Sequence, residues 1–237
     1  MHRFFMTGTD TDVGKTLVAC GLLKALNLKG LKTIGYKPIS AGCERVNGEL
    51  INGDAVNLMN ASSVKLSLAE VNPVAFEPPI APHIAANQAN TVIRPQDIVT
   101  GWHHLAEKSP DVLLTEGAGG WQLPISTTQT LPEVIKQIPQ DVILTVGMRL
   151  GCLNHALLTV DSIKHSGFRL VGWIANHLSD DMLVSQQNIA TLKNMIDAPL
   201  IAEIPWFGDD GAELNHTESL LMRISDCFEI DSLLELD

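Results

Sequence analysis

The stretch GTDTDVGKT, from Gly8 to Thr16, constrains the fold of this chain more than any other segment. A short apolar run, Phe4–Met6, precedes it, and leucines at mixed three- and four-residue spacing follow it. A strand, a glycine-containing loop and a helix in this order are what a phosphate-binding loop requires. In such a loop, backbone N–H groups point at phosphate oxygens. Lys15 reaches the terminal phosphates and the Thr16 hydroxyl ligates magnesium, so the segment predicts nucleotide binding.

The loop departs from the common sequence pattern of phosphate-binding loops, G-x-x-x-x-G-K-[ST]. Thr9 stands at the position of the first glycine, and Gly8 lies one residue earlier. A Gly-Lys-Thr triplet alone is weak evidence, because it also arises at the start of ordinary helices. The competing interpretation is a plain βα turn with Lys15 in the first helical turn. Since strand, glycine and helix are in register, nucleotide binding is the favoured interpretation.

The composition restricts the class of protein. A length of 237 residues, with 45% hydrophobic and 18% charged residues, fits one globular domain over residues 1–237, which would carry the nucleotide-binding loop. No apolar run approaches the roughly 20 residues that cross a bilayer. The chain enters a strand without a leader, so we expect a cytoplasmic protein. Four scattered cysteines, with no C-x-x-C pair among them, predict free thiols.

The formal net charge of −11 predicts that nucleic acid and anionic membranes are not partners. The same charge repels a nucleotide, but salt screens this field within about 8–10 Å. Loop N–H groups, Lys15 and a magnesium ion act inside that distance, so local chemistry should dominate. The charge therefore favours a metal requirement.

Short apolar runs alternate with amphipathic stretches along most of the chain. This alternation predicts an α/β fold like that of P-loop nucleoside triphosphate hydrolases, with a mostly parallel sheet and helices on both faces. The strand candidates are Arg3–Thr7, Thr33–Lys37, Val112–Thr115, Val142–Val146, Leu170–Ala175 and Leu200–Ala202. The tail from Asn215 predicts terminal helices packed on the sheet. Because ligands of such sheets bind beyond the carboxyl ends of the strands, residues just after each strand are the first site candidates.

Two charged residues, one at the end of the second predicted strand and one after it, are further site candidates. Lys37 falls at the carboxyl end of this strand, on the rim of the phosphate loop, and Pro38 stops further pairing. The alternative is a strand-end lysine whose ammonium extends to water. Asp54 follows an Asn-Gly pair at the start of a short helix. There it either caps the helix or ligates magnesium.

The third predicted strand ends in Glu116, and three of the next four residues are glycines. A carboxylate at the carboxyl edge of a central strand suits magnesium or its water shell. The glycines allow a ligand to approach the backbone closely. The alternative is a sharp turn with a solvated glutamate, and the position at the sheet edge favours the functional interpretation.

Residues 71–93 are rich in proline and asparagine and predict a long excursion around a helix that begins near Pro82. His83 is then either a residue of the helix N-terminus or a substrate contact, and the first interpretation is favoured. Long ordered loops of this kind often bind ligands.

Residues after the later strands complete the predicted rim. The helix after Val142–Val146 would hold a carboxylate at its N-terminus, or would simply start there with Asn154 near its cap. Asn176 offers both a donor and an acceptor, as an adenine edge requires. Pro205–Phe207 offers an apolar, aromatic wall for a purine ring.

Five short sequence motifs, taken in their order along the chain, resemble those of the dethiobiotin synthetases, which are ATP-dependent enzymes of biotin synthesis. They are GTDTDVGKT from Gly8, GYKP from Gly35, EGAGGW from Glu116, LGCLNH from Leu150 and EIPW from Glu203. The motifs spread over residues 3–207, nearly the whole chain. The ordered set is highly specific, whereas each motif alone is not.

The resemblance implies that the chain carboxylates 7,8-diaminopelargonate (7,8-diaminononanoate) with CO2 or bicarbonate and closes the ureido ring of dethiobiotin. A carbamate and a mixed carbamic–phosphoric anhydride would be intermediates, and ADP and phosphate would be released. It also implies ATP as co-substrate and Mg2+ as cofactor. A homodimer with the substrate site at its interface is the implied assembly.

The resemblance further implies roles for single residues. Lys37 and Lys15 would be catalytic, and Thr16, Asp54 and Glu116 would serve the metal. The implied nucleotide contacts are Asp12, Val13, Gly14, Lys15, Thr16, Leu17, Asp54, Glu116, Gly117, Ala118, Gly119, Asn176, His177, Pro205, Trp206 and Phe207. The implied substrate contacts are Thr11, Lys37, Ala41, Gly151, Cys152, Leu153 and Asn154.

Three positions depart from this pattern or extend it. The family usually has Ser or Thr where this chain has Ala41, so Ser40 or the backbone would have to replace a hydroxyl contact. The family often has Asp where this chain has His177, which leaves a backbone contact to adenine. Glu213 is a further candidate for a nucleotide contact.

Two other functions compete with this prediction. An amide-forming synthase of cobalamin biosynthesis normally carries a glutaminase domain, for which 237 residues leave no room. An ATP-operated switch of the chromosome-partitioning or iron-protein type typically has a second lysine at the start of the loop. Met6 to Thr9 contains none, so the synthetase is favoured.

Overall fold

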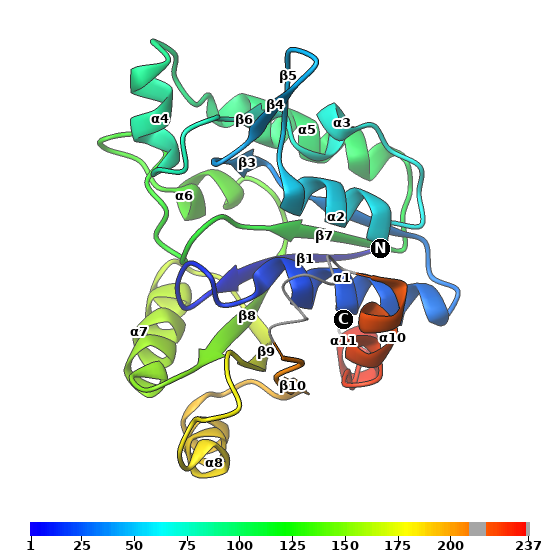
Figure 1. The fold of residues 1–237 in the computed structure, drawn as a ribbon, viewed down its shortest axis with the longest axis vertical. Coiled ribbons are helices and arrows are strands. Elements are labelled where there is room, and N and C mark those ends of the chain that lie inside the picture. Colours follow the sequence, from blue (N-terminus) through cyan, green and yellow to red (C-terminus); the bar gives the residue numbers. More distant parts are fainter. Residues whose placement is uncertain (209–216, 236–237) are drawn as a thin grey trace.

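A computed structural model describes residues 1–208 and 217–235. Parallel strands form a six-stranded central sheet in the order β10-β9-β8-β1-β7-β2 (Figure 1). The strands are β1 His2–Gly8, β2 Thr33–Tyr36, β7 Val112–Glu116, β8 Asp141–Met148, β9 Leu170–His177 and β10 Leu200–Ile204. All six predicted strands are therefore present, and the phosphate-loop strand β1 lies inside the sheet between β7 and β8.

The side chains of β1 explain why helices cover both faces of the sheet. Phe4 and Met6 belong to one buried cluster and Phe5 to the other, because successive strand residues point to opposite faces. On the Phe4 face lie α1 Lys15–Leu28, α2 Gly53–Ala61, α10 Glu218–Ser225 and α11 Asp231–Leu234. On the Phe5 face lie α5 Pro95–Glu107, α6 Leu131–Ile135, α7 Cys152–His165 and α8 Ser185–Met195. The predicted arrangement of helices on both faces is confirmed.

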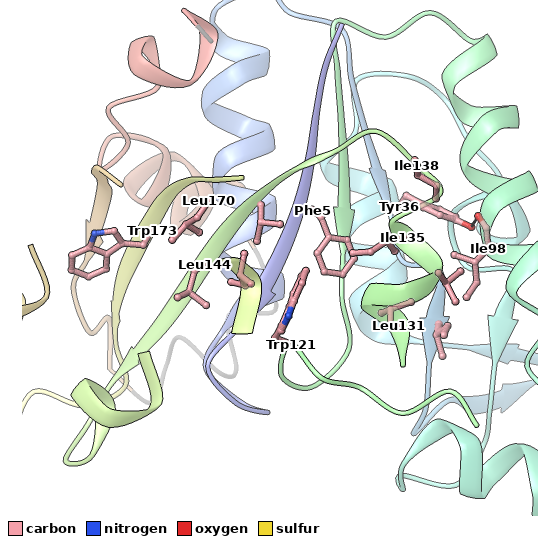
Figure 2. Packing of buried hydrophobic residues seen from close by; sticks show 14 of the residues in the cluster. Phe5, Tyr36, Ile98, Trp121, Leu131, Ile135, Ile138, Leu144, Leu170 and Trp173 are labelled. Atoms are coloured by element: carbon pink, nitrogen blue, oxygen red, sulfur yellow. Dashed lines mark hydrogen bonds between the residues drawn. The ribbon is translucent and has the colours of Figure 1, made fainter. Parts of the chain in front are cut away.

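Aromatic packing on the Phe5 face anchors the turn after β7. Figure 2 shows Phe5 beside Trp121, and their ring centroids lie 5.9 Å apart in an edge-on arrangement. Trp121 also packs edge-on against Phe168, and it is only 4% exposed. The glycine-rich turn between Glu116 and Trp121 is therefore held at both ends by buried side chains.

The chain leaves the sheet at Lys37, one residue earlier than predicted. The Lys37 N–H donates to the Val71 carbonyl at 2.9 Å instead of to a sheet neighbour, and Pro38 has no N–H to donate. The excursion that follows contains β3 Ile39–Ser40, β4 Glu44–Val46, β5 Glu49–Ile51, α3 Leu68–Val71, β6 Val74–Ala75 and α4 Pro82–Gln88. The start of α4 at Pro82 is as predicted. The four short strands were not predicted, because two or three residues give no periodic signal.

The tail of the chain packs on α1. The Lys24 side chain of α1 forms an ion pair with Glu218 of α10, which agrees with the predicted terminal helices. The four cysteines are free, as predicted. Among the helices of residues 1–208 and 217–235, none has both the length and the apolar character that a membrane span needs.

The contact between α1 and α10 leaves no room for a side chain at Gly21. A Cβ there would lie 2.2 Å from Cγ2 of Ile224. We expect Gly21→Ala to lower the free energy of unfolding by about 1–3 kcal/mol, because overpacking outweighs the gain in helix propensity. Urea unfolding measures the change. Gly53→Ala is the matched control, since a Cβ at that helical glycine would meet no atom within 4 Å. Equal midpoints for the two variants would contradict the packing argument.

Candidate active site

The phosphate loop connects β1 to α1 and needs glycine at two positions for different reasons. Gly14 has a φ of 79°, and a Cβ there would lie 2.3 Å from the Asn176 amide nitrogen. A Cβ at Gly8 would lie 2.6 Å from the Val13 side chain. The N–H of Thr9 donates to the Thr145 carbonyl at 3.0 Å, which ties the loop to β8. The loop therefore wraps closely around the start of α1, as a phosphate site requires.

Lys15, the first residue of α1, folds its side chain back over the loop. Its ammonium donates to the Asp10 carbonyl at 2.9 Å, and the residue is 7% exposed. Burial lowers the pKa of Lys15 from its ordinary value of 10.5 to about 8, although the charge of Glu116 acts in the opposite direction. The loop thus holds a buried ammonium whose charge burial disfavours and which a bound phosphate would stabilise.

Lys37 lies buried between two carboxylates. Its ammonium is 2.5 Å from Oε1 of Glu116 and 3.1 Å from Oδ2 of Asp54. The Thr16 hydroxyl donates to the same Glu116 oxygen at 2.8 Å. Burial alone would lower the pKa of Lys37, but Glu116 and Asp54 outweigh it and hold the pKa above its ordinary value. Four elements therefore bring polar groups together at one point: Lys37 follows β2, Glu116 ends β7, Thr16 belongs to α1 and Asp54 to α2.

The structure decides three alternatives that the sequence left open. Lys37 is 3% exposed and Glu116 is fully buried, so neither extends into water. The cap of α2 is Asn52, whose side chain accepts from the Ala55 N–H at 3.2 Å, and not Asp54. Lys37 and Glu116 instead form a buried cluster, and Asp54 lies at its edge.

The oxygen donors of this cluster fit a magnesium ion. Oε2 of Glu116 is buried and has no hydrogen-bond partner within the described residues. Burial raises the pKa of Glu116 even though the Lys37 ammonium lowers it, so a further cation would favour its ionised form. A carboxylate, a second carboxylate and a hydroxyl are hard oxygen ligands of the kind that Mg2+ uses together with phosphates and water. No group of three His, Cys, Asp or Glu side chains suited to a metal occurs in residues 1–208 and 217–235.

A cavity of about 840 Å³ opens beside this cluster. The predicted site residues that line it are Thr11, Asp12, Gly14, Lys15, Thr16, Leu17, Lys37, Ala41, Asp54, Glu116, Ala118 and Gly119. Val13 does not line it, because its side chain is buried behind the loop. Gly117 does not line it either, and its N–H donates to the Met6 carbonyl at 2.9 Å.

The cavity also has lining residues outside the predicted contact set. They are Ser40, Asn52, Pro79, Ile80, Ala81, Pro82, Gly120, Gln122, Leu123 and Pro124. Of these, the sequence had individually raised only Ser40, as a replacement for the hydroxyl contact at Ala41, Gly120, as part of the glycine turn, and Pro82, as the start of a helix. The prediction that the proline-rich segment 71–93 binds a ligand covers Pro79 to Pro82. Gln122, Leu123 and Pro124, after the glycine turn, belong to no motif that indicated a site. Ser40 donates its hydroxyl proton to Asn72 at 2.7 Å, so toward the cavity it remains an acceptor only. His83 is the second residue of α4 and does not line the cavity, as its favoured interpretation predicted.

The residues predicted to hold adenine do not line this cavity. The Asn176 amide donates to the Val13 carbonyl at 2.9 Å. His177, Pro205 and Trp206 line a separate pocket of about 280 Å³. Phe207 does not line it, and its ring instead lies 4.5 Å from the Arg223 guanidinium. Glu213 lies outside the described residues.

The predicted carboxylate site does not reach the cavity within one chain. Gly151 is the N-cap of α7 with a φ of 94°, and Asn154 is the third residue of the helix, so the helix starts here with Asn154 near its cap, as the alternative interpretation predicted. Cys152 is buried, and Gly151 and Asn154 are exposed on a surface apart from Lys37. Arg149, just before this helix, forms an ion pair with Asp10 of the phosphate loop. This link between the two segments was not predicted.

The lowered pKa of Lys15 predicts how stability depends on pH. Between pH 8 and 10.5 the unfolded chain holds a proton that the folded chain has released, so stability rises with pH in this window. Without ligand, we expect Lys15→Met to be more stable than the wild type at pH 7 by roughly 3 kcal/mol at most. The difference should shrink toward pH 10. Urea unfolding at both pH values measures it, with Lys65→Met at an exposed site as control. A difference that does not change with pH would contradict the argument.

The chain is similar to several characterised groups of proteins. The family model described as an AAA domain matches residues 2–213. The chain is 50% identical over 216 residues to the ATP-dependent dethiobiotin synthetase BioD of Alteromonas mediterranea, with 87% of this chain and 93% of that protein covered. It is 48% identical over 202 residues to the protein of the same name from Cellvibrio japonicus, with 85% and 88% covered.

A solved structure supports the fold. A ParA family ATPase from Chlorobium tepidum superposes with a TM-score of 0.59, over 99% of both chains, at 14% sequence identity. At that identity the similarity concerns the fold alone, so it does not favour the switch hypothesis over the synthetase. The sequence identities and their coverage show that the chain belongs to the dethiobiotin synthetase family.

Proposed function

We propose that this chain is an ATP-dependent dethiobiotin synthetase. It converts 7,8-diaminopelargonate, CO2 and ATP to dethiobiotin, ADP and phosphate. The observation that carries the proposal is the convergence of Lys15, Lys37, Thr16 and Glu116 on one cavity at the phosphate loop. The identity of about half the residues with synthetases of that name supports it.

The chemistry needs no nucleophile from the protein. One substrate amine attacks CO2, loses a proton and becomes a carbamate. A carbamate oxygen attacks the γ-phosphorus, and ADP leaves. The second amine then attacks the carbonyl carbon of the mixed anhydride and loses a proton, the C–O bond to the phosphoryl group breaks, and phosphate is released. The protein has to position the reactants and to stabilise negative charge.

The two lysines supply that stabilisation. The pKa of Lys37 is held above its ordinary value by Glu116 and Asp54, so its ammonium remains charged beside the carbamate. The Lys15 ammonium lies at the loop that would hold the triphosphate. The negative charge of a bound phosphate would offset the cost of burying this ammonium. Preorganised cations in a site with little water are the largest common contribution to phosphoryl transfer.

Thr16, Asp54 and Glu116 would hold Mg2+. The ion, when bound, neutralises charge on the phosphates. The free buried oxygen of Glu116 supports this assignment. The Thr16 hydroxyl, which donates to Glu116, keeps that carboxylate oriented toward the phosphate loop.

The remaining wall of the cavity suits the aliphatic chain of the diamine. Ile80, Ala81, Pro82 and Leu123 line it and offer apolar contacts to methylene groups. The substrate carboxylate would bind at Gly151–Asn154 of a second copy, because these residues lie apart from the cavity in their own chain. Leu150 is fully exposed and Leu158 is 62% exposed near this helix, which supports an apolar contact with a partner there.

A product assay tests the function. The chain is incubated with the diamine, MgATP and 13C-labelled bicarbonate, and dethiobiotin is read by mass. We expect one labelled carbon in the product and one phosphate released per product. Equal ATP turnover with and without the diamine would contradict the proposal and would favour an ATP-operated switch.

Lys37→Met is the informative variant in the same assay. It keeps the aliphatic volume and removes the buried ammonium, so we expect kcat to fall by about 100-fold or more. Lys65→Met serves as the matched control, because Lys65 is exposed and remote from the cavity. Normal turnover by a folded Lys37→Met would remove Lys37 from the mechanism.

Metal binding can be read without turnover. We expect Mg2+ to raise the melting temperature of the protein with ADP, because a ligand that binds only the folded state stabilises it. EDTA should reverse the rise, and Glu116→Gln should abolish it. Glu107→Gln, an exposed glutamate on α5, should behave like the wild type. An undiminished rise in Glu116→Gln would exclude Glu116 as a ligand.

A further inference from the structure

We propose that Glu203 selects the nucleobase by accepting a hydrogen bond from its exocyclic amine. The inference rests on the proposed function, because it concerns the nucleotide whose phosphates the Gly8–Thr16 loop would bind. It names a residue that neither the phosphate loop nor the buried lysine cluster contains.

The first observation is where Glu203 lies. It stands near the end of β10, where it is paired with Ala175 of β9. It lines the pocket of about 280 Å³ together with His177, Pro205 and Trp206. The Trp206 side chain is partly exposed, which offers a planar surface on which a base can stack.

Two consecutive residues connect the pocket to the phosphate loop. Asn176 donates its amide to the Val13 carbonyl of the loop at 2.9 Å. The next residue, His177, lines the pocket. A nucleotide that places its phosphates on the loop therefore meets this pocket when its base turns toward β9 and β10.

The second observation is how Glu203 is held. Its Oε1 accepts from Nε2 of His177 at 3.0 Å and from Nε2 of Gln186 at 2.7 Å. These donors come from β9 and from α8, so the carboxylate is fixed from two sides. Oε2 has no hydrogen-bond partner in the part of the chain that the structure describes. The Glu203 side chain therefore presents one fixed acceptor to the pocket.

The free Oε2 of Glu203 can accept a hydrogen bond from a purine with an amine at C6, and it repels a purine with a carbonyl oxygen at C6. The N6 amine of adenine donates, whereas O6 of hypoxanthine or guanine is itself an acceptor and would be repelled. Guanine and hypoxanthine also carry an N1–H, but one acceptor can use it only if the base shifts so that N1, and not C6, lies at Oε2. Asp180 also lines the pocket and adds negative charge, which further disfavours a carbonyl oxygen.

The wild type gives the first test. We measure kcat/KM for dethiobiotin formation with ATP, with inosine triphosphate, and with purine riboside triphosphate, which has neither an amine nor a carbonyl at C6. A charge-assisted hydrogen bond predicts that kcat/KM falls by about 10- to 100-fold from ATP to the purine analogue. Inosine triphosphate should be poorer still. Equal values for ATP and the purine analogue would overturn the inference without any variant.

Glu203→Gln gives a sharper test. His177 and Gln186 donate, so they would hold the oxygen of the new amide and leave its N–H2 at the position of Oε2. That exchange puts a donor where the acceptor was. We therefore expect the ratio of kcat/KM for ATP over inosine triphosphate to fall by about 100-fold or more. An unchanged ratio would overturn the inference.

The controls separate this inference from the proposed function. Glu229→Gln makes the same chemical change at an exposed residue outside this pocket and should leave the nucleotide ratio unchanged. If no nucleotide supports dethiobiotin formation, the proposed function fails. If all three nucleotides support it equally well, only the role of Glu203 fails.

Discussion

The site depends on one buried ion pair, in which the Lys37 ammonium lies 2.5 Å from the fully buried Glu116 carboxylate. Removing either partner would leave an uncompensated charge inside the protein, which costs several kcal/mol. Lys37 follows β2 and Glu116 ends β7, while Asp54 and Thr16 bring in α2 and α1. The pair therefore holds four elements in one arrangement at the carboxyl edge of the sheet.

The same edge carries the phosphate loop, because β1 is an inner strand and its neighbours run parallel to it. The Gly117 N–H donates to the Met6 carbonyl at 2.9 Å, which sets the glycine turn after β7 next to the loop after β1. Thr9 connects the loop to β8 in the same way. Backbone donors, two lysines, and carboxylate and hydroxyl oxygens thus lie at one edge of the sheet, which the parallel order of the strands is enough to create.

Much of this could be read from the amino-acid order. The strands of the central sheet could be predicted because short apolar runs alternate with amphipathic stretches. The phosphate loop could be predicted because its residue types follow from what phosphate binding requires. The burial of Lys37 and Glu116 could not be read, since the same residues at a strand end are equally compatible with solvent. The Glu203 contacts had no local signal, because His177 and Gln186 come from other elements. For Gly151–Asn154, a role in the site depends on a second copy of the chain.

The amino-acid order by itself determined the parallel α/β fold, the phosphate loop and the family, because periodicity and short motifs depend on neighbours along the chain. Only the tertiary structure decided which candidate groups meet: that Lys37 lies between Glu116 and Asp54, that Asn52 and not Asp54 caps α2, and that the residues predicted to contact the base, His177, Pro205 and Trp206, line a pocket of their own. The physical reason is that burial and charge pairing depend on groups far apart in sequence. The side chains that compensate Lys37 stand 17 and 79 positions away from it.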